Sequence, residues 1–117
     1  MLAGMRPELD DKSFVFVVIE DGASAPGNAF ALVHEAEGTT AIVPTQDAEP
    51  LFARITLAVH SDLEGVGLTA AVSSALAAKG IACNVIAGFH HDHLFVPWER
   101  GVEALGILEA LSHDARR

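Results

Sequence analysis

The sequence predicts an α+β protein in which an antiparallel-rich sheet carries its helices on one face. Short apolar segments of strand type dominate the chain. Helical segments fall only in its second half, so strands and helices do not alternate regularly. Of the 117 residues, 50% are hydrophobic and 20% are charged, which is enough apolar material for a stable core. The predicted order is three strands, a linker, then strand, helix, strand, strand and helix.

The first half is expected to contain strands only. Residues 13–19 (SFVFVVI) form a nearly continuous β-branched and aromatic run, as in a strand covered on both faces. Residues 21–28 are rich in glycine, proline and asparagine, which favour a loop. Polar and apolar residues then alternate and Glu37-Gly38 provides a turn, so residues 30–43 are predicted to form a β-hairpin.

The segment 44–50 (PTQDAEP) is polar and flanked by prolines, and it is the best internal boundary. It divides the chain into an N-terminal β-rich half, residues 1–50, and a C-terminal half, residues 51–117. The second half begins with an alternating strand at 52–59. A helix at 68–79 follows because apolar residues recur there at helical spacing, namely Leu68, Ala71, Val72, Ala75 and Leu76.

The last part of the chain is predicted to be a second hairpin and a second helix. Residues 81–89 and 93–96 are strands joined by a polar tip, and residues 98–112 carry an apolar helical face that should dock on the sheet. Asn84 lies in the first of these strands, which we expect to run parallel beside 52–59. This order of elements is part of a ferredoxin-like βαββαβ fold without its last strand, and the first half could complete the sheet.

Charge and composition limit the partners and the compartment. With 7 Lys and Arg against 16 Asp and Glu the net charge is −9, so neither nucleic acid nor an anionic membrane is expected as a partner. Cys83 is the only cysteine, which excludes an internal disulfide and agrees with a reducing compartment. The N-terminal residues lack the apolar core of a signal peptide, and no run approaches the length of a membrane helix. We expect a cytoplasmic protein.

The stretch 60–68 (HSDLEGVGL) is the strongest candidate for a ligand site. A strand that ends in a glycine-containing turn and opens a helix presents unpaired N–H groups and the positive end of a helix dipole, which suit a carboxylate. Ser61 or Asp62 could instead cap the helix. Asn84 is unusual in a strand, and it could either satisfy a nearby loop or hold a polar ligand near this turn.

Two other motifs are weaker candidates. The run HHDH at 90–93 suggests a metal, but alternate residues of a hairpin face opposite ways, so at most two ligands converge where zinc needs three or four. A polar hairpin tip is the simpler interpretation. His60-Ser61-Asp62 cannot form a hydrolytic triad, because adjacent residues in an extended segment point to alternate sides. We therefore expect no catalytic site and no cofactor.

Several short motifs occur together in the second half: a strand ending at His60-Ser61, the turn Gly67-Leu68-Thr69-Ala70, Gly80-Ile81, Asn84-Val85-Ile86, and HDHLFVP at 91–97. Together they resemble an ACT domain of the aspartokinase type. More narrowly, they resemble small stand-alone bacterial ACT-domain proteins related to the paired ACT domains of aspartokinases. The first half, with FVFVVIEDG at 14–22 and EAEGTTAIVP at 35–44, is similar to that family's N-terminal half.

The resemblance implies a ferredoxin-like regulatory module of the ACT type that binds an amino acid or a similar small molecule, usually between two ACT units. In such domains the ligand meets the turn after the first strand and the backbone of the second strand. Related domains often have Pro-Gly before the helix, where this chain has EGVG at 64–67. The matching positions in this chain are Ser61, Asp62, Leu63, Gly65, Val66, Gly67, Leu68, Asn84, Val85 and Ile86.

The leading hypothesis is a non-enzymatic, homodimeric ACT-like sensor that binds a free amino acid through the turn 60–68 and strand residues 84–86. The alternative is a module that keeps the fold for self-association without a ligand, with exposed strand edges serving a dimer interface. A metal-binding protein using His91 and His93 is the third hypothesis.

Overall fold

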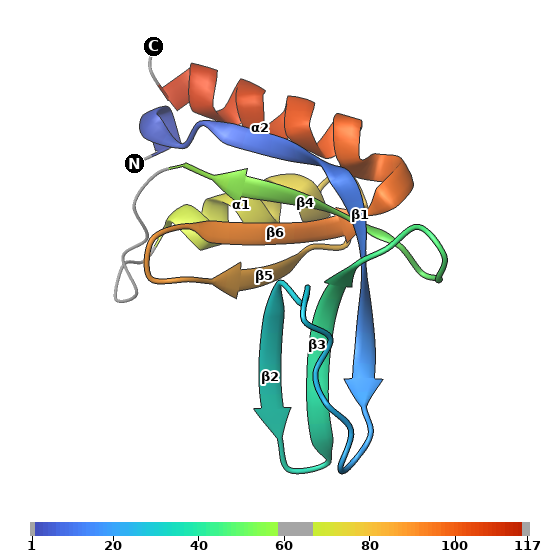
Figure 1. Cartoon of the computed structure of the whole chain (residues 1–117). Helices are drawn as coiled ribbons and strands as arrows, with labels where there is room; N and C mark the ends of the chain where they lie inside the picture. The colour runs from blue at the N-terminus through green and yellow to red at the C-terminus, as the bar shows by residue number, and fades with distance from the viewer. Residues whose placement is uncertain (1, 59–66, 116–117) are drawn as a thin grey trace.

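The computed structural model describes residues 2–58 and 67–115, which form a six-stranded sheet with α1 and α2 against one of its faces (Figure 1). The predicted α+β class, with an antiparallel sheet and helices on one face, is confirmed. The strands are β1 (Pro7–Ile19), β2 (Ala31–Glu35), β3 (Gly38–Pro44), β4 (Phe52–Leu57), β5 (Asn84–Ala87) and β6 (Asp92–Pro97). The helices are α1 (Leu68–Ala77) and α2 (Gly101–Ala115), with 3₁₀ turns at Leu2–Gly4 and Trp98–Arg100.

The strand order is β2-β3-β1-β4-β6-β5, and every neighbouring pair is antiparallel. The expectation that the strand carrying Asn84 lies beside β4 is wrong, because β6 lies between β4 and β5. A tight turn after β5, in which the Gly88 N–H donates to the His91 carbonyl at 2.9 Å, returns the chain at once as β6. The returning strand therefore takes the antiparallel place next to β4, and Asn84 pairs with Phe95 instead.

Strand β1 completes the sheet of the second half. Its first residues, from Pro7 to Leu9, pair with β4, and its last residues, from Phe14 to Ile19, pair with β3. In a ferredoxin-like sheet the last strand lies beside the first, and here the start of β1 fills that place beside β4. The sequence pattern predicted β1 only from residue 13, because the preceding ELDDK has a polar composition that is unfavourable for a strand.

A bulge in β1 bends the sheet. Leu9 pairs with Ile55 and Ser13 pairs with Ala53, so residues 10–12 stand opposite the single residue Arg54. Extra residues in one strand bend it and increase its twist. Beyond the bulge, β2, β3 and the end of β1 form an arm, residues 14–44, that extends away from the helices (Figure 1). The described residues accordingly span 52 × 31 × 22 Å.

The two faces of the sheet carry separate cores. The helix-face core joins both helices to one face of β4 and β6, and Ile55, Leu76, Leu94 and Leu108 are at its centre with at most 1% of their surface exposed. On the other face, the bent sheet closes over an aromatic cluster. The members of this aromatic cluster are Phe14, Phe16, Phe30, Phe52 and Phe95.

Helix boundaries differ from the predicted ones by a few residues at the most. Helix α1 ends at Ala77, and the N–H of Ile81 donates to the carbonyl of Leu76 at 3.0 Å, which closes the helix end. Ile81 is therefore buried against the helix and does not join β5, which begins at Asn84. The predicted helix at 98–112 is a 3₁₀ turn followed by α2, which continues to Ala115.

Candidate functional site

The predicted ligand-binding turn is described only at its end. Ser61, Asp62, Leu63, Gly65 and Val66 fall within 59–66, outside the described residues. Gly67 immediately precedes α1 and has a φ of +106°, a conformation that favours glycine over any residue with a Cβ atom. In the described parts of the chain no side chain caps this helix, so the N–H groups of its first turn have no side-chain acceptor there.

The described site residues divide between the two faces of the sheet. Leu68 and Val85 are partly buried against the helix-face core, where they contribute to packing. Asn84 and Ile86 lie on the other face, since they pair with Phe95 and His93. Of these two, Asn84 is exposed and Ile86 packs beside the aromatic cluster.

The strand register places Asn84 away from Leu57, the residue at which β4 ends. Asn84 is level with Arg54, whereas Ala87 is level with Leu57, the last residue of β4. Three residues of strand separate these levels, or roughly 10 Å. In the described sheet β5 has β6 as its single neighbour, so the outer edge of the β5 backbone is open to a ligand or to another strand.

Arg54 is a residue of this face that the sequence analysis did not single out. Its guanidinium carbon lies 4.9 Å from the ring centre of Phe14 and 4.6 Å from that of Phe30, so the cation is held against two rings of the aromatic cluster. Its Nη2 donates a short hydrogen bond to Oδ2 of Asp10, which the β1 bulge brings opposite. A lone arginine in an alternating strand was the available signal, but its partner Asp10 lies before the strand that the sequence predicted.

The charge of Arg54 lowers the pKa values of Asp10 and His93. Burial alone raises the pKa of Asp10, but the backbone N–H of Lys12 and the Arg54 guanidinium lower it more, so that the net pKa lies below its ordinary value. Burial lowers the pKa of His93, and the positive charges of Arg54 and His91 lower it further against the opposing effect of Asp92. His93 therefore favours its neutral form.

The HHDH run does not form a metal site among the described residues. His93 places Nδ1 3.0 Å from Oγ1 of Thr56 and its ring 4.8 Å from that of Phe30, so it is engaged with the face of the sheet. The His91 ring lies 6.5 Å from the His93 ring and is exposed. Within residues 2–58 and 67–115, no group of three or more His, Cys, Asp or Glu side chains could hold a metal ion.

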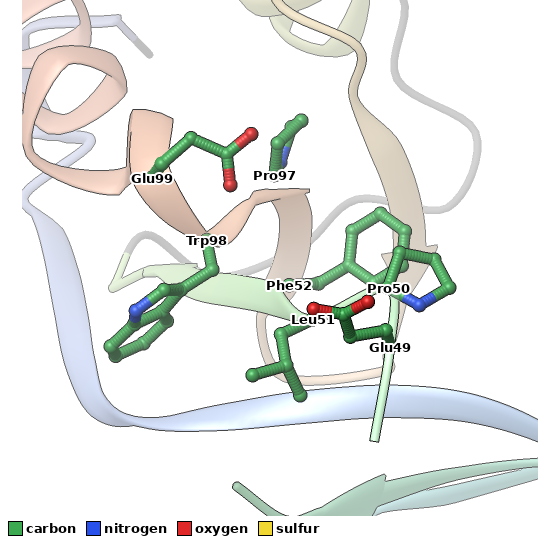
Figure 2. A pocket seen from close by; sticks show the side chains of 7 residues that line it. All are labelled: Glu49, Pro50, Leu51, Phe52, Pro97, Trp98 and Glu99. Atoms are coloured by element: carbon green, nitrogen blue, oxygen red, sulfur yellow. The ribbon is translucent and has the colours of Figure 1, made fainter. Parts of the chain in front are cut away.

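A pocket of about 670 Å³ lies at the other end of β4 from the predicted turn (Figure 2). Two segments form it, one leading into β4 and one leaving β6. The N–H of Trp98 donates to the carbonyl of Leu51 at 3.0 Å and joins these segments. The pocket is lined by Glu49, Pro50, Leu51, Phe52, Pro97, Trp98 and Glu99.

Comparison with known proteins identifies the family. Two family models, each described as an ACT domain, match residues 1–58 and residues 53–110. A Vibrio cholerae protein of known structure, described as a protein of unknown function and possible transport protein, is 38% identical, with a TM-score of 0.77. The alignment covers 92% of this chain and 90% of that one. This chain belongs to the ACT-domain family.

More distant structures share the ACT fold. The ligand-free regulatory subunit of aspartate kinase from Thermus thermophilus is 12% identical with a TM-score of 0.68, over 92% of this chain and 97% of that chain. Protein Atu0741 from Agrobacterium tumefaciens is 14% identical with a TM-score of 0.67, over 86% of this chain and 84% of that chain. A search of curated proteins finds no match. In the described parts of this ACT-domain protein, no helix is long and apolar enough to cross a membrane.

Proposed function

We propose that this ACT-domain protein is a cytoplasmic regulatory sensor, without catalytic activity of its own, that binds a free amino acid at the start of α1. The observation that carries the proposal is the start of α1 at Gly67, which has a positive φ. No described side chain accepts a hydrogen bond from the N–H groups of the first helical turn. Such groups and the helix dipole favour a carboxylate. The ACT family matches over residues 1–110 support a small-molecule ligand.

The edge of β5 supplies the second part of the proposed site. Its outer backbone can bond the ammonium and carboxylate groups of an amino acid, and the exposed Asn84 amide can add a hydrogen bond. Asn84 lies roughly 10 Å along the sheet from the end of β4. A homodimer in which the turn of one copy meets β5 of the other would bring the two parts together, and we propose this assembly.

A thermal-shift screen of the twenty amino acids, followed by isothermal titration, tests the sensor. A ligand at 100 times its Kd should stabilise the protein by about 2.7 kcal/mol, which is a visible rise in Tm. Gly67→Val should abolish this rise. Gly22→Val is the matched control, because Gly22 also has a positive φ and open space around it but lies far from α1 in the sequence. Both variants strain the backbone, so only the ligand response separates them.

Two outcomes would contradict the proposal. The first is a flat response to every amino acid at millimolar concentration. The second is a ligand response in Gly67→Val equal to that in Gly22→Val, which would place the ligand elsewhere.

The alternative, a dimerisation module without a ligand, is favoured by apolar side chains exposed on the arm. Val18 and Val33 both pair with Thr40 and share a face, with 73% and 43% of their surface exposed. Dimers in light scattering that Val33→Lys dissociates, together with a negative ligand screen, would support this function.

A further inference from the structure

The pocket of Figure 2 has the composition of a site for a small organic cation, and nothing in the proposed sensor function uses it. We propose that it binds a free alkylammonium compound. Its volume of about 670 Å³ lies in the usual range for small-molecule sites. The pocket lies at the start of β4, which begins at Phe52. The proposed amino-acid site follows the other end of that strand, so the two sites are independent.

All the charged residues that line the pocket are acidic. Glu49 and Glu99 are its charged lining residues, one from each segment, and no lysine, arginine or histidine lines it. The adjacent Arg100 is engaged elsewhere, since its Nε donates to Glu103 at 2.6 Å and its Nη2 to the carbonyl of Lys79 at 3.0 Å. Among the described residues no ion pair joins either pocket carboxylate to a cation. A bound cation would neutralise them.

The apolar walls select the kind of cation. Pro50, Leu51, Phe52 and Pro97 add hydrocarbon surface to the pocket lining, which suits alkyl groups better than a hydrated metal ion. Trp98 is 42% exposed and lines the pocket, and tryptophan gives the strongest cation–π interaction of the aromatic side chains. An alkylammonium compound offers its charge to the carboxylates and the indole and its hydrocarbon to the apolar lining.

The backbone of the two pocket segments is held in place before any ligand binds. Phe52 pairs with Pro97 in the sheet, and the backbone hydrogen bond from Trp98 to Leu51 fixes the two segments against each other. The pocket therefore needs no rearrangement of its backbone walls, which lowers the entropic cost of binding.

Trp98 also makes the test direct. It is the only tryptophan and the chain has no tyrosine, so fluorescence excited at about 295 nm comes from this pocket alone. Choline is the probe, and its neutral isostere 3,3-dimethyl-1-butanol is the matched ligand control, both titrated at constant ionic strength. Choline should change the emission saturably, and the neutral alcohol should not.

Substitutions separate a cation site from an apolar surface. The double variant with Glu49→Gln and Glu99→Gln should weaken choline binding roughly tenfold, because the attraction of two exposed carboxylates for the cation is lost. Glu109→Gln, on an exposed turn of α2, controls for net charge and should bind choline as the original protein does. No saturable change with choline would overturn the proposal. Equal affinity of the alcohol, or unchanged affinity in the double variant, would overturn it as well.

Discussion

At the scale of single residues, Arg54 connects the two parts of the protein. We call the described residues outside the arm, 2–13, 45–58 and 67–115, the body. Arg54 belongs to β4 in the body, stacks on Phe14 and Phe30 of the arm, and pairs with Asp10 at the bulge between them. The side chains of the pair are only 20% and 22% exposed. Water therefore screens this ion pair less than one on the open surface.

Removing the carboxylate partner should destabilise the protein in a pH-dependent way. Because the pKa of Asp10 is lowered in the folded state, its contribution is full above the unfolded value of about 3.9 and is lost as pH falls through the folded pKa. Asp10→Asn should lower the free energy of unfolding by about 1 kcal/mol at pH 7, and by much less at pH 3. Urea unfolding at both values measures this.

Asp47→Asn is the matched control for this substitution, because Asp47 is an exposed carboxylate outside any described ion pair. Its free energy of unfolding should stay within about 0.5 kcal/mol of the original at pH 7. Equal losses in the two variants at pH 7 would contradict a stabilising role for the Asp10–Arg54 pair.

At the scale of elements, α2 approaches the sheet through a glycine. A Cβ atom added at Gly101 would lie 2.9 Å from the Cβ of Ala53 on β4, closer than side chains tolerate. Gly106 lies in the same helix, and a Cβ there would meet nothing within 4 Å. Substitution at Gly101 therefore tests the close packing of α2 on β4, whereas substitution at Gly106 tests helix propensity alone.

Alanine at these positions should have opposite effects on stability. Gly101→Ala should lower the free energy of unfolding by about 1–2 kcal/mol through overpacking against β4. Gly106→Ala should raise it by about 0.5–1 kcal/mol, since alanine is the better helix former. Chemical denaturation of both variants measures the difference. A stabilised Gly101→Ala protein would show that α2 does not need its close contact with β4.

The strands and helices that could be predicted are those whose apolar residues repeat at a regular spacing. Val72 and Leu76 of α1 and Ala104 and Leu108 of α2 are buried as their spacing predicted. The start of β1 could not be predicted, because residues 8–12 are polar and their strand conformation depends on pairing with β4. The hairpin of β5 and β6 was predicted, but local composition did not reveal that β6, and not β5, lies beside β4.

The part of the candidate site that depends on local backbone conformation could be predicted from the sequence. Gly67 was expected at a turn that opens a helix, and its positive φ agrees with that. Arg54 and the Trp98 pocket could not be found in the same way. Each brings together residues that are far apart in the sequence. Strand register places Asp10 beside Arg54. The backbone hydrogen bond from Trp98 to Leu51 joins the two segments that carry Glu49 and Glu99. Ligand binding at Ser61 to Leu68 and at Asn84 to Ile86 stays a prediction.

At the scale of the whole molecule, the aromatic cluster packs the arm against the body. Phe95 of β6 is fully buried, and its ring meets those of Phe14 and Phe16 at 5.5 Å, both from β1. Phe30, from the loop before β2, completes the contact at 5.8 Å. Arm and body should therefore unfold in a single transition.

Truncating the central ring should separate the arm from the body. Phe95→Ala should cost about 3–5 kcal/mol, because it leaves a cavity between the two parts. Far-ultraviolet circular dichroism and Trp98 fluorescence should give one shared urea transition in the original protein and separate transitions in the variant. Separate transitions already in the original protein would show that arm and body fold independently.

The place of β1 beside β4 has a consequence for how the chain folds as it is made. Residues 7–9 are translated before their partner strand β4 and before α2, which contacts them near Gly101. The sheet of the second half thus cannot close until a strand translated earlier pairs with its edge. A fragment of residues 51–117 would expose that edge of β4 as an unpaired strand, and such edges attract other chains.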